Sequence, residues 1–282
     1  MRCLLRPSSD RSLIAGLPVE TTVGDVTDRD AMRTVTPGVD AVVHCAATTS
    51  ETSSDYAASH RTNAVGTKHL VEACEENGVA RFVLISTQSA NESNTSAYGR
   101  TKLEAERIVE ASKLAYTILR PSTVYGPGAR GLFAKIGRYV STLPLVPVIG
   151  NGRQRFRPIY VGDVAQAILL CLESAATVRK KYDLGGLDGI SFAEFIDGVG
   201  EALGKKRPQL RLPVPLCLGI ARVLSFAKNP PLTVDNIVGI TQMSECDISK
   251  AQEDFGFLPL SFAEGIGILR REGAGAGEQR VG

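Results

Sequence analysis

Tyr98 and Lys102 are the two residues of this 282-residue chain whose types and spacing most directly suggest chemistry. They stand four positions apart in a segment that we expect to be helical, so a phenol and an ammonium group share one helix face. At ~4 Å and an effective dielectric of ~20, the lysine charge favours the phenolate by ~4 kcal/mol, which would lower a phenol pKa from ~10 to ~7. Such a group suits general acid/base catalysis. Because the same spacing also occurs by chance on surface helices, the surroundings of the pair decide its interpretation.

Two hydroxyl groups precede the pair at the end of an apolar run. Ser86 and Thr87 follow the run Phe82–Ile85, which we predict to be a strand. Hydroxyls at that place can hydrogen-bond a substrate oxygen beside Tyr98. The four side chains together predict a site for proton transfer to or from an oxygen.

The elements that would position this site alternate along the chain. We predict strands at Arg2–Leu5, Val19–Val23, Ala41–His44, Phe82–Ile85, Tyr116–Leu119 and Pro158–Val161. We predict helices at Asn63–Glu76, Ala97–Ser112 and Val164–Leu172, the last with Asp163 as its N-cap. Short apolar runs that alternate with helix-length segments are typical of βαβ units. The predicted fold class is therefore α/β, with a doubly wound, Rossmann-like parallel sheet.

The character of the chain changes beyond about residue 180, where short helices and loops follow. Capping boxes at Ser191/Glu194 and Ser261/Glu264 predict two helix starts there. We therefore expect a Rossmann-like NAD(P)-binding domain over 1–178 and a small, mostly helical substrate lobe over 179–272. The Gly- and Ala-rich segment 273–282 is expected to be a disordered tail.

With these motifs in this order, the sequence resembles the extended short-chain dehydrogenase/reductases, also called the NAD-dependent epimerase/dehydratase family. The resemblance covers residues 1 to about 200. It implies that Tyr98 is the acid/base, that Thr87 is the catalytic hydroxyl, and that Lys102 holds the nicotinamide ribose and lowers the Tyr98 pKa. It also implies that Asn63 supports a proton relay. The other cofactor-binding residues that the resemblance implies are Asp25, Val26, Cys45, Ala46, Ala47, Ser86, Pro121 and Thr123. His44 invites a catalytic interpretation, but the match makes it a strand-end residue.

The N-terminal region departs from the family pattern. Members begin with a strand and a G-x-x-G-x-x-G turn that packs the pyrophosphate on a helix N-terminus. Here Met1 falls where the second strand of that pattern starts, so the first strand and the glycine-rich loop are missing. A late start codon is the simplest explanation of this expected truncation, since strand edges would otherwise be exposed.

A second departure concerns the substrate. Many sugar-nucleotide members carry an arginine ahead of a Val-x-Asp motif, where this chain has Phe156 before Val161-Gly162-Asp163. Arg153, Arg155 and Arg157 alternate, so in an extended segment they share one face and could bind a substrate phosphate; a solvated arginine face is the alternative. The segment is more similar to that of reductase-like members and of the nucleotide-binding accessory subunit of respiratory complex I.

The end of the second family strand indicates the cofactor. NAD-preferring members place an acid there for the ribose 2′-hydroxyl. Here Arg6, Ser8 and Ser9 occupy that end, and the first acid is Asp10. A cation with two hydroxyls suits a 2′-phosphate, so NADP is the expected cofactor and NAD the alternative, in which Arg6 stacks on the adenine.

Composition limits the function classes. Lys and Arg exceed Asp and Glu by two, which gives no reason to expect nucleic acid as a partner. Six scattered cysteines form no C-x-x-C pair, and three histidines show no metal-ligand spacing, so we expect reduced thiols, a cytoplasmic location and no metal. No run of apolar residues is long enough for a transmembrane segment. A small-molecule substrate and a homodimer are the expected partners.

The leading interpretation is an NAD(P)-dependent oxidoreductase or epimerase/dehydratase that acts on a carbinol or ketone carbon, in a sugar nucleotide or another alcohol or ketone. Two alternatives stay open. One is a non-catalytic nucleotide-binding protein or respiratory-complex assembly protein, although such a scaffold has no chemical need for Thr87, Tyr98 and Lys102. The other is an inactive fragment from a late start codon.

Overall fold

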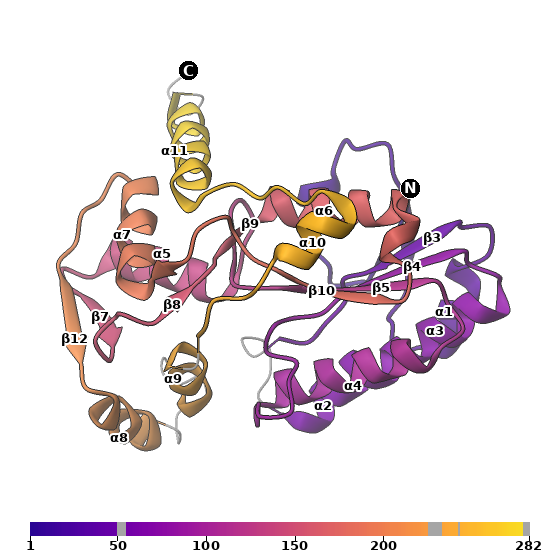
Figure 1. The fold of residues 1–282 in the computed structure, drawn as a ribbon, viewed down its shortest axis with the longest axis horizontal. Helices are drawn as coiled ribbons and strands as arrows, with labels where there is room; N and C mark the ends of the chain where they lie inside the picture. Colours follow the sequence, from indigo (N-terminus) through magenta and orange to yellow (C-terminus); the bar gives the residue numbers. More distant parts are fainter. Residues whose placement is uncertain (50–54, 225–232, 242, 279–282) are drawn as a thin grey trace. The chain divides into compact units, whose positions relative to one another are not determined.

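A computed structural model of the chain describes residues 1–49, 55–224, 233–241 and 243–278. The chain divides into two compact units, the first made of residues 1–120 and 168–182, the second of residues 121–167 and 183–282 (Figure 1). This division differs from the boundary predicted at residue 178. Residues 121–167 join the second unit because two of their strands pair with strands from the C-terminal part of the chain.

Two parallel sheets form the frame of the first unit. Strands β1 (Arg2–Leu5) and β2 (Glu20–Val23) pair in parallel, and the four-stranded sheet has the order β10-β5-β4-β3. In the second sheet, β3 (Ala41–His44), β4 (Arg81–Ile85) and β5 (Tyr116–Pro121) are parallel neighbours, with β10 (Lys180–Leu184) beside β5. The predicted α/β class with a parallel sheet is confirmed.

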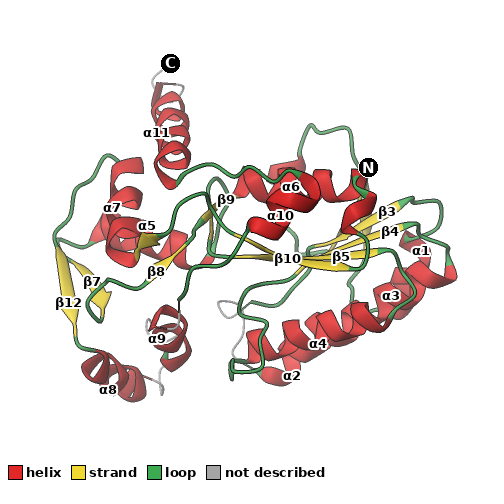
Figure 2. Ribbon diagram, viewed as in Figure 1, coloured by secondary structure: helices red, strands yellow, loops and turns green. Residues whose placement is uncertain are grey.

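Helices follow the strands of the first unit in the βαβ order that the alternating pattern predicts (Figure 2). They are α1 (Arg29–Val35), α2 (Tyr56–His60), α3 (Gly66–Glu76), α4 (Ala97–Ala111) and the C-terminal part of α6 (Val161–Glu173), with 3₁₀ turns at Ser12–Ile14 and Ala175–Thr177. Apolar residues of the strands pack on α3 and α4 in one buried cluster, which includes Phe82, Leu84, Val71 and Val109. This packing fixes α4, the helix of Tyr98 and Lys102, along the four-stranded sheet.

Most predicted bounds are confirmed within one or two residues; the exceptions are one helix of the first unit and, in the second unit, one strand with the start of the helix that follows it. The helix predicted from Asn63 starts with a π-helical turn, Arg61–Val65, and continues as α3 from Gly66. The predicted strand Pro158–Val161 is reduced to β9 (Ile159–Tyr160), because helix α6 already begins at Val161. Asp163 is therefore not the N-cap: it lies inside the first turn of α6, and its carboxylate accepts a hydrogen bond from the Leu260 backbone N–H, 3.0 Å away.

The second unit combines short strand pairs with helices. β6 (Val124–Tyr125) pairs with β9, β7 (Val146–Ile149) with β12 (Gln209–Leu212), and β8 (Arg155–Phe156) with β11 (Ile190–Ser191). Its helices are α5 (Gly131–Thr142), α7 (Phe192–Ala202), α8 (Val214–Leu224), α9 (Val234–Thr241), α10 (Ser249–Phe255) and α11 (Phe262–Glu278). Both predicted capping boxes are present, with the Ser191 and Ser261 hydroxyls accepting from the Glu194 and Glu264 backbone N–H groups.

Three further features concern the C-terminal helix, membrane-spanning helices and groups of metal-binding side chains. Helix α11 extends to Glu278, while residues 279–282 of the expected tail lie outside the described residues. None of the helices in the described ranges is both long and apolar enough to cross a membrane. Within the same ranges, no three His, Cys, Asp or Glu side chains gather in a way that could hold a metal ion.

Candidate active site

Helix α4 places Tyr98 in its first turn. The Ser96 side chain caps this helix by accepting a hydrogen bond from the Gly99 backbone N–H, 3.1 Å away. Gly99 lets the loop after β4 pack closely here, because a Cβ at this position would lie 2.6 Å from the Ser89 carbonyl oxygen. The phenol of Tyr98 is partly exposed. The cap and the glycine therefore fix the start of the helix against the loop that carries Thr87.

Lys102 lies one turn further along α4 and is buried, with 2% of its surface exposed. Its Nζ donates a hydrogen bond to the Ile85 carbonyl oxygen, 2.7 Å away, at the end of strand β4. Burial lowers the pKa of Lys102 to about 8, although the negative charge of Glu106 acts in the opposite direction. An ammonium group in such surroundings is costly for the fold, and perturbed buried groups of this kind cluster at functional sites.

The two predicted hydroxyls have different surroundings. Thr87 is partly exposed, and its Oγ1 accepts a hydrogen bond from the Ser89 backbone N–H at 3.2 Å. Ser86 is buried, and its hydroxyl donates to Glu106 Oε1 at 2.5 Å. Because a hydroxyl has one hydrogen to donate, that of Ser86 is committed to Glu106. The expected hydrogen bond from a hydroxyl to a substrate oxygen is thus left to Thr87.

Asn63 lies in the π-helical turn and is buried. Its Oδ1 accepts from the Thr48 backbone N–H at 2.7 Å, and its Nδ2 donates to the Thr48 carbonyl oxygen at 2.9 Å and to Thr101 Oγ1 at 3.0 Å. Single π-turns inside helices are frequently found at functional sites. Here Asn63 joins the segment after β3, through Thr48, to Thr101, the residue before Lys102. The role of Asn63 in a proton relay stays a prediction.

His44 at the end of β3 is buried against the same helix. Its Nε2 lies 2.9 Å from Thr67 Oγ1, and that hydroxyl donates to the Asn63 carbonyl oxygen at 2.5 Å. Since the Thr67 hydroxyl hydrogen is used in this way, we assign a proton to His44 Nε2, which then donates to Thr67 Oγ1. Burial, together with the charge of Lys102, lowers the pKa of His44 to about 3, so the imidazole is neutral near pH 7.

The residues predicted to hold the adenine end lie after β1 and β2. Asp25 Oδ1 accepts from the backbone N–H of Thr27 at 2.9 Å and from its hydroxyl at 2.8 Å. The backbone N–H of Thr27 is the main cause that lowers the Asp25 pKa, with smaller contributions from the charges of Arg6 and Arg61. Arg6 is exposed. The Val26 side chain is buried in the core, so its backbone is the part that can face a ligand.

The remaining cofactor candidates lie at the ends of strands. Cys45 and Ala46 are exposed after β3, and Ala47 is partly exposed. Pro121 and Thr123 belong to the second unit, where Pro121 is buried and the Thr123 carbonyl oxygen accepts from the Ile159 backbone N–H at 3.0 Å. Within the first unit, the described residues thus offer an ammonium, hydroxyls, a carboxylate and exposed backbone at the strand ends, which fits a nicotinamide dinucleotide.

The three candidate substrate arginines belong to the second unit. Arg155 pairs with Glu245 at 2.6 Å and also donates to the Gly189 carbonyl oxygen. Arg157 lies 3.7 Å from the same carboxylate and donates to the Leu187 carbonyl oxygen at 2.6 Å. Arg153 is exposed. Two of the three guanidinium groups therefore share one internal carboxylate, that of Glu245, which the alternating pattern did not indicate.

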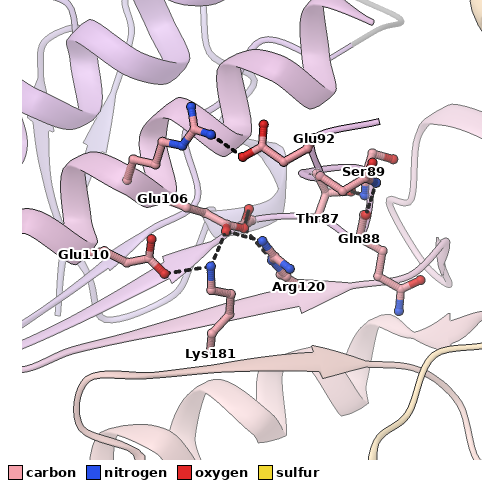
Figure 3. Close-up of polar contacts among 11 residues, drawn as sticks. Thr87, Gln88, Ser89, Glu92, Glu106, Glu110, Arg120 and Lys181 are labelled. Carbon is pink, nitrogen blue, oxygen red and sulfur yellow. Dashed lines mark hydrogen bonds and ion pairs between the residues drawn. The ribbon is translucent and has the colours of Figure 1, made fainter. Parts of the chain in front are cut away.

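Sequence reasoning missed Glu106, the carboxylate that receives the Ser86 hydroxyl. Glu106 is fully buried and also accepts from Arg120 and Lys181, as Figure 3 shows. Its spacing could have indicated it, because it lies four positions after Lys102 and eight after Tyr98, on the same helix face.

Comparison with known proteins agrees with this arrangement. Residues 4–185 match the model of the NAD dependent epimerase/dehydratase family. Among curated proteins, the chain is 26% identical to a 2-alkyl-3-oxoalkanoate reductase from Stenotrophomonas maltophilia, with 89% of this chain and 86% of the relative covered. It is 28% identical to the UDP-glucose 4-epimerase of Vibrio cholerae, over 84% of this chain and 77% of that protein.

A third relative is the mitochondrial NADH dehydrogenase [ubiquinone] 1 alpha subcomplex subunit 9 of Arabidopsis thaliana. It is 27% identical over 78% of this chain, and the chain spans 55% of its length. Among solved structures, the UDP-glucuronic acid 4-epimerase from Bacillus cereus in complex with NAD is similar in fold, with a TM-score of 0.70, 23% identity, and coverage of 91% of this chain and 81% of that one. The chain belongs to the NAD-dependent epimerase/dehydratase family, the extended short-chain dehydrogenase/reductases.

Proposed function

We propose that this protein is an NADP-dependent oxidoreductase or epimerase that acts at a carbinol or ketone carbon of a small molecule. The observation that supports this most directly is the buried ammonium of Lys102, one helical turn from Tyr98. A buried lysine lowers the stability of the fold, so its presence beside a phenol is better explained by chemistry than by packing. The family's members are epimerases, dehydratases and reductases that use a nicotinamide dinucleotide.

In the proposed mechanism, Tyr98 exchanges a proton with the substrate oxygen through its phenol Oη. The positive charge of Lys102 stabilises the phenolate form, so that the proton can leave and return near neutral pH. The Thr87 hydroxyl donates a hydrogen bond to the same substrate oxygen and stabilises negative charge that develops on it. The nicotinamide, when bound, supplies the hydride acceptor or donor for the reacting carbon.

Cofactor positioning is divided among several strand ends in this proposal. Lys102 would hold the nicotinamide ribose, and the exposed segment 45–47 would lie along the pyrophosphate. Asp25 and the Val26 backbone would contact the adenine, and Arg6 would pair with the 2′-phosphate of NADP. Support for Arg6 is its exposure at the end of β1 and its closeness to Asp25, which is sufficient for its charge to lower the Asp25 pKa.

The proposal can be tested without knowing the substrate, by titrating Tyr98. Tyrosinate absorbs near 295 nm, and the difference between the titration curves of the wild-type protein and of Tyr98→Phe isolates this one phenol. We expect Tyr98 to ionise at least ~2 pH units below an ordinary phenol, and we expect Lys102→Met to remove most of that shift. A Tyr98 that titrates like an ordinary phenol would show that the pair is a feature of a helix surface.

With a substrate in hand, the same variants test catalysis. NADPH oxidation at 340 nm can be screened with 3-oxoalkanoates and other ketones, and UDP-glucose can be screened for epimerisation, as the relatives suggest. Tyr98→Phe is expected to lower kcat at least ~100-fold while it leaves NADP affinity nearly unchanged. Equal turnover by the wild-type protein and the variant would contradict the acid/base role.

A second candidate function is a non-catalytic subunit or assembly role, which the similarity to the mitochondrial NADH dehydrogenase subunit favours. This function needs a nucleotide site but no activated phenol. The tyrosinate titration therefore separates the two candidates, since a scaffold has no reason to keep the Tyr98 pKa low.

A further inference from the structure

A charged cluster centred on a fully buried carboxylate lies one to two helical turns along α4 from Lys102. We call it the Glu106 cluster; it consists of Ser86, Glu106, Glu110, Arg120 and Lys181. Figure 3 labels the last four of these residues. All five residues belong to the first unit. They come from the end of β4, from α4, from β5 and from β10. The cluster thus joins one helix to three neighbouring strands.

Glu106 is the centre of this cluster. Its side chain is fully buried, and both oxygens are engaged. Arg120 binds it in a bidentate manner, with Nε 2.7 Å from Oε1 and Nη2 2.5 Å from Oε2. Lys181 Nζ lies 3.0 Å from Oε2, and the Ser86 hydroxyl donates to Oε1. Burial alone would raise the pKa of Glu106, but the hydrogen bonds from Arg120, Ser86 and Lys181 together hold it below its ordinary value, so the group is a carboxylate.

Two consecutive residues at the end of β4 are bonded to two consecutive turns of α4. Lys102 donates to the Ile85 carbonyl oxygen, and Glu106 accepts from the Ser86 hydroxyl. Thr87 follows directly, and Tyr98 precedes Lys102 by one turn on the same helix face. The position of the Thr87 backbone relative to the helix of Tyr98 is therefore determined by two short polar contacts, one from each turn.

We propose that Glu106 is the positioning residue of the Tyr98–Lys102 site: it holds the strand end that carries Thr87 against helix α4 and keeps a negative charge one turn behind Lys102. This inference rests on the proposed function, because it assigns Glu106 a role in the chemistry of Tyr98. Glu106 itself does not contact a substrate in this proposal. It acts through Ser86 and Lys102.

The charged groups around Lys102 make this role measurable. From its own helix Lys102 faces Glu106, and beyond it Glu110, which pairs with Lys181. From the end of β3 it faces the neutral His44 and the thiol of Cys45. Arg120 and Lys181 add positive charge on the far side of Glu106. Without the carboxylate, these cations would disfavour the ammonium form of Lys102, because Glu106 raises its pKa. Once Lys102 is neutral, Tyr98 loses the nearest positive charge that stabilises its phenolate.

The experiment is the tyrosinate titration at 295 nm, carried out on Glu106→Gln with and without Tyr98→Phe. We expect the pKa of Tyr98 to rise by at least ~1 unit, a tenfold change in its ionisation constant. The matched control is Glu110→Gln, one turn further along α4, which contacts Lys181 but not Ser86. In this control the pKa of Tyr98 is expected to equal that of the wild-type protein.

Ser86→Ala keeps the test valid if Glu106→Gln does not fold, because it removes one hydroxyl and leaves the ion pairs in place. In this variant, the backbone amide hydrogens of Thr87 and its neighbours are expected to exchange at least ~10-fold faster. The pKa of Tyr98 is expected to rise, as in Glu106→Gln. If the pKa of Tyr98 is low and neither variant changes it, and if amide exchange is as in the wild-type protein, the positioning role is overturned and the proposed function stays intact. An ordinary phenol titration in the wild-type protein would overturn the proposed function and this inference together.

Discussion

The ammonium nitrogen of Lys102 lies 2.7 Å from the carbonyl oxygen of Ile85, the last residue of strand β4. This one hydrogen bond joins the helix of the candidate acid/base to the strand end that carries Thr87. Lys102 is buried at a free-energy cost, so the site and the stability of the fold oppose each other at this residue. The first prediction follows from that opposition.

Lys102→Met is expected to raise the free energy of unfolding at pH 7 by up to ~3 kcal/mol, because the pKa of Lys102 is lowered from 10.5 to about 8 in the folded state. Below pH 8 both states carry the proton, and the cost of the buried charge is fully present. Between pH 8 and 10.5 the unfolded state binds more protons, so wild-type stability rises and the advantage of the variant shrinks. Urea unfolding at several pH values measures this; a variant less stable than wild type at pH 7 would contradict the assignment.

His44 predicts an acid-dependent loss of stability. Its pKa falls from 6.5 in the unfolded chain to about 3 in the folded protein. Above pH 6.5 the imidazole is neutral in both states, and as the pH falls below 6.5 the unfolded state takes up a proton that the folded state does not. By pH 4.5 this linkage removes about 3 kcal/mol.

His44→Gln, which can still donate to Thr67, is therefore expected to flatten the dependence of stability on pH between 6.5 and 4.5. The matched control is His60→Gln, since the side chain of His60 is 41% exposed. Equal slopes for wild type and His44→Gln in urea unfolding would mean that His44 is protonated in the folded protein.

The close packing at Gly99 gives a prediction about the start of α4. An added Cβ would lie 2.6 Å from the Ser89 carbonyl oxygen and from Asn94 Cγ, so the loop that carries Thr87 must move. Gly99→Ala is expected to lower the free energy of unfolding by ~1–3 kcal/mol, as overpacked sites do. Gly137→Ala, where the nearest atom is 3.8 Å away, should be neutral or stabilising by up to ~1 kcal/mol. If the two substitutions have the same effect on stability, the loop does not pack on α4 as described.

The elements of the first unit could be predicted from sequence because their signals are local. The alternating apolar runs and the spacing of Tyr98 and Lys102 each need only a few neighbouring residues. The π-helical turn at Arg61–Val65 could not, because it presents nearly the same apolar periodicity as an α-helix. Helix α6 starts earlier than Asp163 indicates. The Asp163 carboxylate does not cap the helix but accepts a hydrogen bond from the backbone N–H of Leu260, 97 positions away, which no local pattern reveals.

The Glu106 cluster shows the same limit within the site. The position of Glu106 one turn after Lys102 is visible in the sequence, but its partners are not. Arg120 is 14 positions away and Lys181 is 75 positions away, and they meet Glu106 only because β5 and β10 are neighbours in the sheet. Similarly, the alternation of Arg153, Arg155 and Arg157 correctly suggests a shared face for two of them, but not that Glu245 lies on it.

Arg6 carries the prediction about cofactor choice. Its exposed guanidinium at the end of β1 would pair with the 2′-phosphate of NADP, while the nearby Asp25 carboxylate is left for the adenine. Arg6→Asp is expected to weaken NADP binding at least ~10-fold relative to NAD, because it replaces an attraction to the phosphate by a repulsion. Arg11→Asp is the matched control, since Arg11 is also exposed but lies beyond the turn at Arg6–Ser9. Calorimetric titration with both cofactors gives the ratio of affinities for each variant. A ratio that is unchanged in Arg6→Asp would mean that Arg6 does not bind the 2′-phosphate. An equal change in Arg11→Asp would mean that the charge of the surface, and not Arg6 in particular, affects cofactor choice.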